Sequence, residues 1–185
     1  FQLDNIFLKK YDTNINGFVK IDLYQNKAFF NGEILHENIL FDTKIQATKK
    51  YLDLYVQSEK VESLKFLKDF ISLDKGTQSW MYDRVSGDIK LNYLTLRYDF
   101  EKNELLSDFL DLDANIKNSK VNFNDKAKHL DIDNVHIKLQ NGKLTFEFTN
   151  PIYNKTSLDG SSLYIQDIFK DGKSKLFLNL KSNSL

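Results

Sequence analysis

The chain has 185 residues, which is enough for one domain with a sizeable core. Its 26 basic and 26 acidic residues give a net charge of zero, so no excess charge attracts it to nucleic acid or to an anionic membrane surface. It has no Cys, which excludes disulfides and thiol catalysis, and no apolar run is long enough to span a membrane.

Residues 11–23, YDTNINGFVKIDL, match the start of a calcium-binding EF-hand loop. The matching residues, at the first, third, fifth and sixth places, are Asp12, Asn14, Asn16 and Gly17. The twelfth place requires a bidentate Glu but holds Leu23. Asn-Gly between apolar stretches is a strong hairpin signal, and the residues after it alternate as in a strand. We therefore predict a β-turn at Asn16-Gly17 and no calcium site.

Apolar residues recur at every second position over most of the chain, which is typical of antiparallel strands with one wetted face. Before residue 58 these rows are Val19, Ile21 and Leu23; Ile39, Phe41 and Ile45; and Leu52, Leu54 and Val56. Turn-forming pairs along the chain are Asn31-Gly32, Asn141-Gly142, Asp159-Gly160 and Asp171-Gly172. The pattern predicts on the order of ten strands, mostly joined by tight turns in an up-and-down meander.

A helical insert at about 58–84 interrupts the strands. Apolar residues there follow helical spacing, Ser58 can cap the start, and Gly76 can end the helix. We expect one substantial helix at about 59–73, followed by a short helical turn that carries Trp80.

The single domain thus consists of strands at 1–57, the insert at 58–84 and strands at 85–185. The apolar rows of the last part comprise Ile89, Leu91, Tyr93, Leu110, Leu112, Ala114, Ile116, Val121, Phe123, Val135, Ile137, Leu139, Leu144, Phe146, Phe148, Leu163, Ile165, Leu176, Leu178 and Leu180. One helix cannot cover so many apolar faces. They must meet each other in a sandwich or barrel, or line a groove that something else fills.

Two stretches have a more specific pattern than alternation alone. Residues 66–100, FLKDFISLDKGTQSWMYDRVSGDIKLNYLTLRYDF, combine an apolar helix, a turn with Trp80 and a strand led by Gly87. Residues 130–168, LDIDNVHIKLQNGKLTFEFTNPIYNKTSLDGSSLYIQDI, contain two strands, a Pro151-Tyr153 step and a further strand with Gly160 and Ile165. With these two stretches the chain resembles the AsmA-like family of the YhdP and TamB type, and the second stretch resembles the family's repeating strand unit.

The resemblance implies a mainly β fold: an antiparallel meander that forms an open, taco-shaped groove with one helical insert. It implies a section of a lipid-transfer bridge that conducts phospholipid acyl chains across the periplasm of a Gram-negative bacterium, between the inner and outer membranes. The apolar rows at 85–185 would then line the groove, and Trp80 would anchor the insert or stand at the groove mouth. Because the chain begins at Phe1 without a Met, we expect the rest of a longer chain, with its inner-membrane anchor, and other envelope proteins to be its partners.

Two alternatives remain open on sequence alone. A structural or adhesive β-sandwich module of a cell-surface protein would bury the same apolar rows against each other. A section of a lipopolysaccharide-transport bridge would have a similar groove, and its cargo also carries acyl tails.

Residues suited to catalysis or metal binding are sparse. The histidines are His36, His129 and His136, and no metal-binding spacing joins them. In DIDNVH, Asp131 and Asp133 share one strand face while His136 points to the other, so the solvated face of a strand is the better interpretation. We expect no enzyme activity, no cofactor and no metal site.

Overall fold

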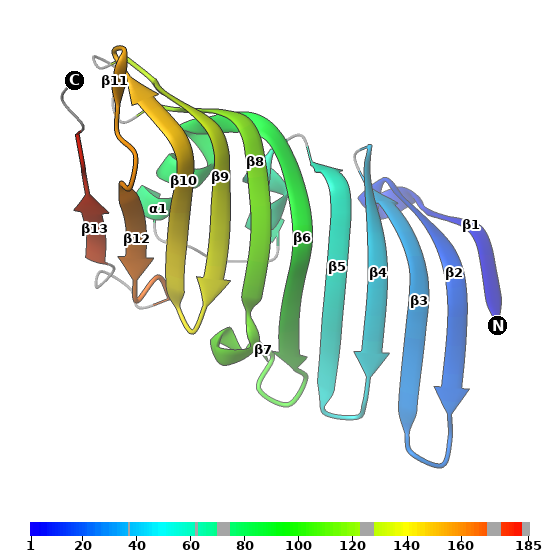
Figure 1. The fold of residues 1–185 in the computed structure, drawn as a ribbon. Helices are drawn as coiled ribbons and strands as arrows, with labels where there is room; N and C mark the ends of the chain where they lie inside the picture. Colours follow the sequence, from blue (N-terminus) through cyan, green and yellow to red (C-terminus); the bar gives the residue numbers. More distant parts are fainter. Residues whose placement is uncertain (37, 62, 70–74, 123–127, 170–174, 183–185) are drawn as a thin grey trace.

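The computed structural model describes residues 1–36, 38–61, 63–69, 75–122, 128–169 and 175–182 (Figure 1). Its strands are β1 (Gln2–Leu8), β2 (Thr13–Asp22), β3 (Lys27–His36), β4 (Ile39–Ala47), β5 (Tyr51–Val61), β6 (Val85–Asp99), β7 (Glu104–Leu105), β8 (Asp111–Val121), β9 (Leu130–Gln140), β10 (Lys143–Tyr153), β11 (Thr156–Ser157), β12 (Ser162–Gln166) and β13 (Lys175–Asn179). Helical segments are η1 (Lys9–Tyr11), η2 (Leu64–Asp69), α1 (Lys75–Asp83) and η3 (Ser107–Phe109).

All these strands belong to one antiparallel sheet with the order β1-β2-β3-β4-β5-β6-β8-β9-β10-β12-β13. The short strands β7 and β11 pair with β6 and β10. The sheet is open: β1 and β13 lie at opposite edges (Figure 1). The predicted mainly β, antiparallel meander is therefore confirmed, and an open sheet of this kind is consistent with a groove. Within the described part of the chain, no helix has the length and apolar character needed to cross a membrane.

One face of the sheet, called here the inner face, carries an apolar row that crosses strand after strand. The cross-strand partners in this row are Val56, Leu94, Leu112, Leu139, Leu144, Ile165 and Leu176. Side chains of a strand alternate between the two faces, so this register places every second residue of each strand on the same side. The predicted period-two rows are thus brought together on one surface.

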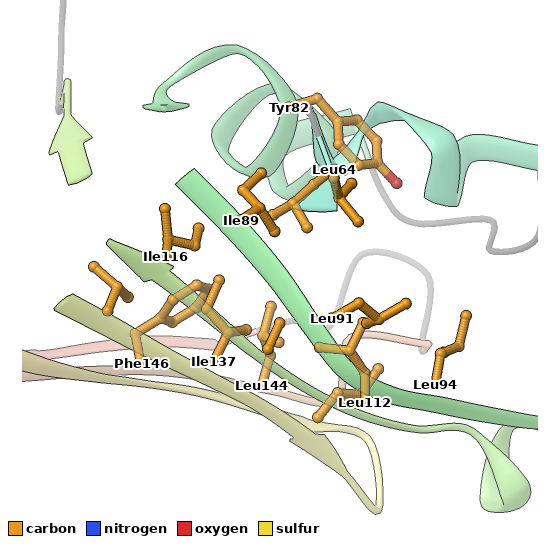
Figure 2. Close-up of a cluster of buried hydrophobic side chains, with 14 of the residues drawn as sticks. Leu64, Tyr82, Ile89, Leu91, Leu94, Leu112, Ile116, Ile137, Leu144 and Phe146 are labelled. Atoms are coloured by element: carbon orange, nitrogen blue, oxygen red, sulfur yellow. The ribbon is translucent and has the colours of Figure 1, made fainter. Parts of the chain in front are cut away.

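The helical insert covers the inner face in the C-terminal half of the sheet. α1 lies behind this half in Figure 1 and contacts β6. Leu64 of η2 and Tyr82 of α1 are 4% and 5% exposed, and Figure 2 shows them above Ile89 of β6. Burial of these apolar side chains from water is the main stabilising contribution of the insert. β5 and β6, which flank the insert, pair directly, so the insert leaves the sheet unbroken.

The helix prediction was wrong in its position. β5 continues to Val61, so residues 59–61 pair with β6 instead of starting a helix. The helical residues are Leu64–Asp69 and Lys75–Asp83, and residues 70–74 lie outside the described part. Ser58 caps no helix: its buried hydroxyl donates a hydrogen bond to the carbonyl of Leu40, 2.7 Å away. Gly76 lies inside α1 and does not end a helix. Strand pairing with β6 outweighs the local helical spacing here.

Two predicted turns are strand interiors instead. Gly17 of β2 and Gly32 of β3 face each other in register. A Cβ at Gly32 would lie 2.1 Å from the carbonyl oxygen of Asn16, so the two backbones approach closely only because side chains are missing. The amide oxygen of Asn16 also accepts a hydrogen bond from the backbone N–H of Asn5 in β1. The turns at Asn141-Gly142 and Asp159-Gly160 are confirmed, and Asp171-Gly172 lies outside the described residues.

Candidate functional site

The predicted groove residues of the C-terminal half lie in a closed core. Those at most 6% exposed are Ile89, Leu91, Leu110, Leu112, Ala114, Ile116, Val121, Val135, Ile137, Leu139, Leu144, Phe146, Leu163 and Ile165. Phe148 is partly buried and packs against this core. These side chains already have protein partners, so an added ligand has little free surface to contact among them.

The other predicted residues have different surroundings. Leu176, Leu178 and Leu180 are 62%, 46% and 58% exposed at the β13 edge. Tyr93 belongs to the opposite, outer face, because a bulge between Leu91 and Tyr93 shifts the alternation of β6. Its ring stacks on Tyr55 with centroids 6.5 Å apart. Phe123 lies outside the described residues; Trp80 lies in α1, and its side chain is outside the described part.

The inner face of the N-terminal half is hollowed and open. A groove of about 640 Å³ crosses β2 to β6. Its lining consists of Leu8, Tyr11, Thr13, Ile15, Ile34, His36, Phe41, Thr43, Ile45, Leu52, Leu54, Val56 and Leu94. We call this the apolar groove. Its size lies within the range of about 300–1,000 Å³ that is usual for small-molecule sites.

Cross-strand pairing assembles the groove floor from residues far apart in sequence. Ile15 of β2 pairs with Ile34 of β3, and Ile34 pairs with Phe41 of β4. Ile45 of β4 pairs with Leu54 of β5. All five are apolar residues whose strand neighbours point to the outer face. The predicted rows contained Phe41, Ile45 and Leu54 but not Ile15 and Ile34.

The one polar residue in the middle of the floor, Thr43, is satisfied within its own strand. It is 1% exposed, and its hydroxyl donates to the carbonyl of Phe41 at 3.2 Å. A buried hydroxyl with a partner does not need water. The middle of the apolar groove therefore offers only apolar contacts.

Polar groups gather at one end of the apolar groove. Thr13 Oγ1 lies 2.8 Å from the carbonyl oxygen of Tyr11 and 2.9 Å from Nδ1 of His36. Nδ1 of His36 lies 3.0 Å from the same carbonyl oxygen. These contacts tie the start of β2, the end of β3 and η1 together. We call Tyr11, Thr13 and His36 the polar end of the groove.

Beyond the opposite end, the inner face has a second, smaller hollow of about 300 Å³. Ile21, Ala28 and Ala47 are among its lining residues, together with Lys27 and Lys49. These apolar residues occupy one register row of β2, β3 and β4. Apolar surface therefore continues along the strands from the apolar groove to the hairpin that joins β2 and β3.

The outer face carries polar networks rather than a metal site. His136 contacts Asp113 through Nε2 at 3.0 Å and Glu147 through Nδ1 at 3.3 Å. Asp131 pairs with His129 instead, and Asp133 accepts a hydrogen bond from Asn150. The three residues thus contact different partners, and those of Asp133 and His136 lie on neighbouring strands. Among the residues that the structure describes, no cluster of three His, Cys, Asp or Glu could hold a metal ion.

A further outer-face hollow of about 620 Å³ surrounds Arg97. The Arg97 guanidinium forms a bidentate ion pair with Asp53, with Nη2 and Oδ2 3.0 Å apart. It also lies 4.3 Å from the ring centroid of Phe109 and 5.2 Å from that of Tyr51. Its Nε and Nη2 groups and its planar faces have partners within the chain, and the ion pair joins β5 to β6 across the strands.

No family model matches this chain, and no curated protein and no solved structure matches it either.

Sequence reasoning missed most of the apolar groove. The rows through Phe41 and Leu54 were recognised as apolar, but the lining was assigned to the strands after the insert. β1 and β3 were not predicted; for β3 the reason is that the Asn31-Gly32 pair indicated a turn in its middle. The available signal for β3 was that Phe30 and Ile34 continue the every-second-residue spacing across that pair.

Proposed function

We propose that this chain binds lipid acyl chains in the apolar groove and serves as one section of a lipid-transfer path in a bacterial envelope. The observation that supports this most is the contrast between the two halves of the inner face. The apolar rows of the C-terminal half are buried, with α1 in contact with β6, whereas the N-terminal half has an open, apolar floor of about 640 Å³. Exposed apolar surface of this kind usually marks a binding site.

The energetics favour an acyl chain as occupant. Each methylene group moved from water into an apolar site contributes roughly 0.8 kcal/mol, so a chain of about sixteen carbons gains on the order of 10 kcal/mol before binding costs. Apolar contacts are not directional, and the hydroxyl of Thr43, in the middle of the floor, is bonded within its own strand. A lipid tail can therefore slide along the floor without breaking hydrogen bonds, which is what transfer requires.

The proposed setting follows the resemblance to AsmA-like proteins. In that setting the chain lies in the periplasm of a Gram-negative bacterium, the rest of a longer chain continues the path, and the cargo is phospholipid. The role needs no catalytic residue and no cofactor. A dry β-sandwich is less well supported, because the described strands belong to one sheet and the open part of its inner face has no second sheet on it.

Native mass spectrometry of the chain, purified without detergent after incubation with phospholipid vesicles, tests the proposal. We expect the parent chain to carry lipid. Ile34→Trp should reduce the lipid-bound fraction several-fold, because the larger side chain fills the floor of the apolar groove.

The matched control is Leu35→Trp, the same substitution at the next residue of β3. Leu35 is 38% exposed on the outer face, so this variant should carry as much lipid as the parent. A parent chain that carries no lipid, or two variants that lose lipid equally, would contradict the proposal.

A further inference from the structure

The apolar groove is asymmetric along its length. Its polar lining residues apart from Thr43 are Tyr11, Thr13 and His36, and all three lie at the polar end. Thr43 is buried and bonded to its own strand. A ligand that fills this groove therefore meets hydrogen-bonding groups at one end and apolar contacts over the rest.

The hydrogen bonds at the polar end determine which ring nitrogen of His36 can contact a ligand. The Tyr11 carbonyl can only accept, and both Thr13 Oγ1, at 2.8 Å, and His36 Nδ1, at 3.0 Å, are within reach of it. When both donate to this carbonyl, the proton of His36 is on Nδ1. Nε2 is then the ring atom left to meet a ligand, since no described residue forms a hydrogen bond with it. A phosphate oxygen can only accept, so Nε2 contacts it as a donor in the imidazolium form, in which both ring nitrogens carry a proton.

Positive charge lies beside the same end. The ammonium of Lys10 lies 5.1 Å from the centroid of the Tyr11 ring, which itself lines the groove. Lys9 precedes it in η1. None of the described residues that line the apolar groove carries a carboxylate. The nearest acidic residues in the sequence are Asp12, which is exposed, and Glu37, which lies outside the described residues.

We propose that the polar end of the groove is a subsite for the phosphate of a phospholipid, with Lys10 and His36 as its contacts and the acyl chain along Ile15, Ile34 and Phe41. This inference rests on the proposed function, because it needs a lipid in the groove. Lysine binds phosphate as a point charge, and charge-assisted hydrogen bonds are the stronger ones. The subsite gives a bound lipid a fixed direction: the head lies at η1 and the tail points across β3 and β4.

Two single-chain probes isolate the phosphate. Myristoyl lysophosphatidylglycerol and monomyristoylglycerol have the same tail, and only the first carries a phosphate. Both are titrated calorimetrically, below their micelle concentrations, into the parent chain, Lys10→Glu, His36→Gln and Lys20→Glu. Lys20 is the matched control, since it is an exposed residue of β2 on the outer face.

We expect the parent to bind the phosphate-bearing probe about tenfold more tightly than the neutral one, which corresponds to one charge-assisted contact. Lys10→Glu should remove this preference and leave the neutral probe unchanged. His36→Gln should reduce the preference several-fold, and Lys20→Glu should change neither affinity. The preference should weaken as the salt concentration is raised, because Lys10 is exposed.

The outcomes separate the two proposals. If both probes bind equally to the parent, or if Lys20→Glu acts like Lys10→Glu, the phosphate subsite is refuted while the lipid groove stands. Equal weakening of both probes by Lys10→Glu would show that Lys10 acts through packing and would also refute the subsite. If neither probe binds the parent, the proposed function fails and the subsite with it.

Discussion

Truncating Phe146 should destabilise the fold far more than truncating Ile34, although both lie on the inner face. Phe146 is 1% exposed and pairs with Ile137 of β9 and Leu163 of β12, which are also buried. Removal of a buried Phe side chain costs about 3–5 kcal/mol, out of a typical total of about 5–15 kcal/mol. For a domain of this size each kcal/mol lowers the melting temperature by roughly 2–4 °C, so Phe146→Ala should lower it by about 6–20 °C.

Ile34 lies on the open floor of the apolar groove, where part of its side chain meets solvent rather than protein. Ile34→Ala should therefore cost only about 1–2 kcal/mol, or roughly 2–8 °C in melting temperature. Thermal melts of the two variants, followed by circular dichroism without lipid, make the comparison. Equal losses would refute the division of the inner face into a closed half and an open half.

Three further predictions concern single residues elsewhere. Gly32→Ala should lower the melting temperature by several degrees, because its Cβ would lie 2.1 Å from a backbone oxygen of β2; an unchanged melt would contradict the close approach of β2 and β3. Burial lowers the pKa of His136, but its hydrogen bonds to Asp113 and Glu147 outweigh this, so the net pKa is raised. The stability that His136 contributes is therefore fully present below its unfolded pKa of about 6.5 and is lost as the pH rises through the folded pKa. In urea unfolding, the parent chain should exceed His136→Gln in free energy of unfolding by more at pH 5 than at pH 9. The same difference at both pH values would refute this. Burial raises the pKa of Tyr82 to about 12, and its hydroxyl has no hydrogen-bond partner among the described residues. Tyr82→Phe should therefore raise the melting temperature by a few degrees, because it removes a buried polar group. A lower melting temperature would indicate a partner for this hydroxyl.

The sequence was most informative where burial and alternation coincide. Val135, Ile137 and Leu139 alternate with polar residues, and β9 places all three at 1–4% exposure. A strand with one buried face has a strongly specified register, so its pattern predicts both the element and its orientation. The turn at Asn141-Gly142 was predictable for the same reason, because it lies between two such strands.

Local signals failed where partners distant in sequence decide the structure. The Asn-Gly pairs at 16–17 and 31–32 are strong turn signals in isolation, yet each glycine allows the other strand to approach. Residues 59–61 were predicted to start the helix, but they belong to β5, and Val61 pairs with Ile89 of β6. Which half of the inner face is open depends on where η2 and α1 dock, and no single strand's sequence encodes that position.

The central claim is that the open half of the inner face holds lipid. Site-specific photocrosslinking in bacterial cells tests it most directly, with a benzophenone side chain placed at position 34 on the floor of the apolar groove or at position 35 on the outer face of the same strand. Mass spectrometry of the irradiated chain should show a phospholipid adduct at position 34 and none at position 35. Adducts at neither position, or equal adducts at both, would contradict the account.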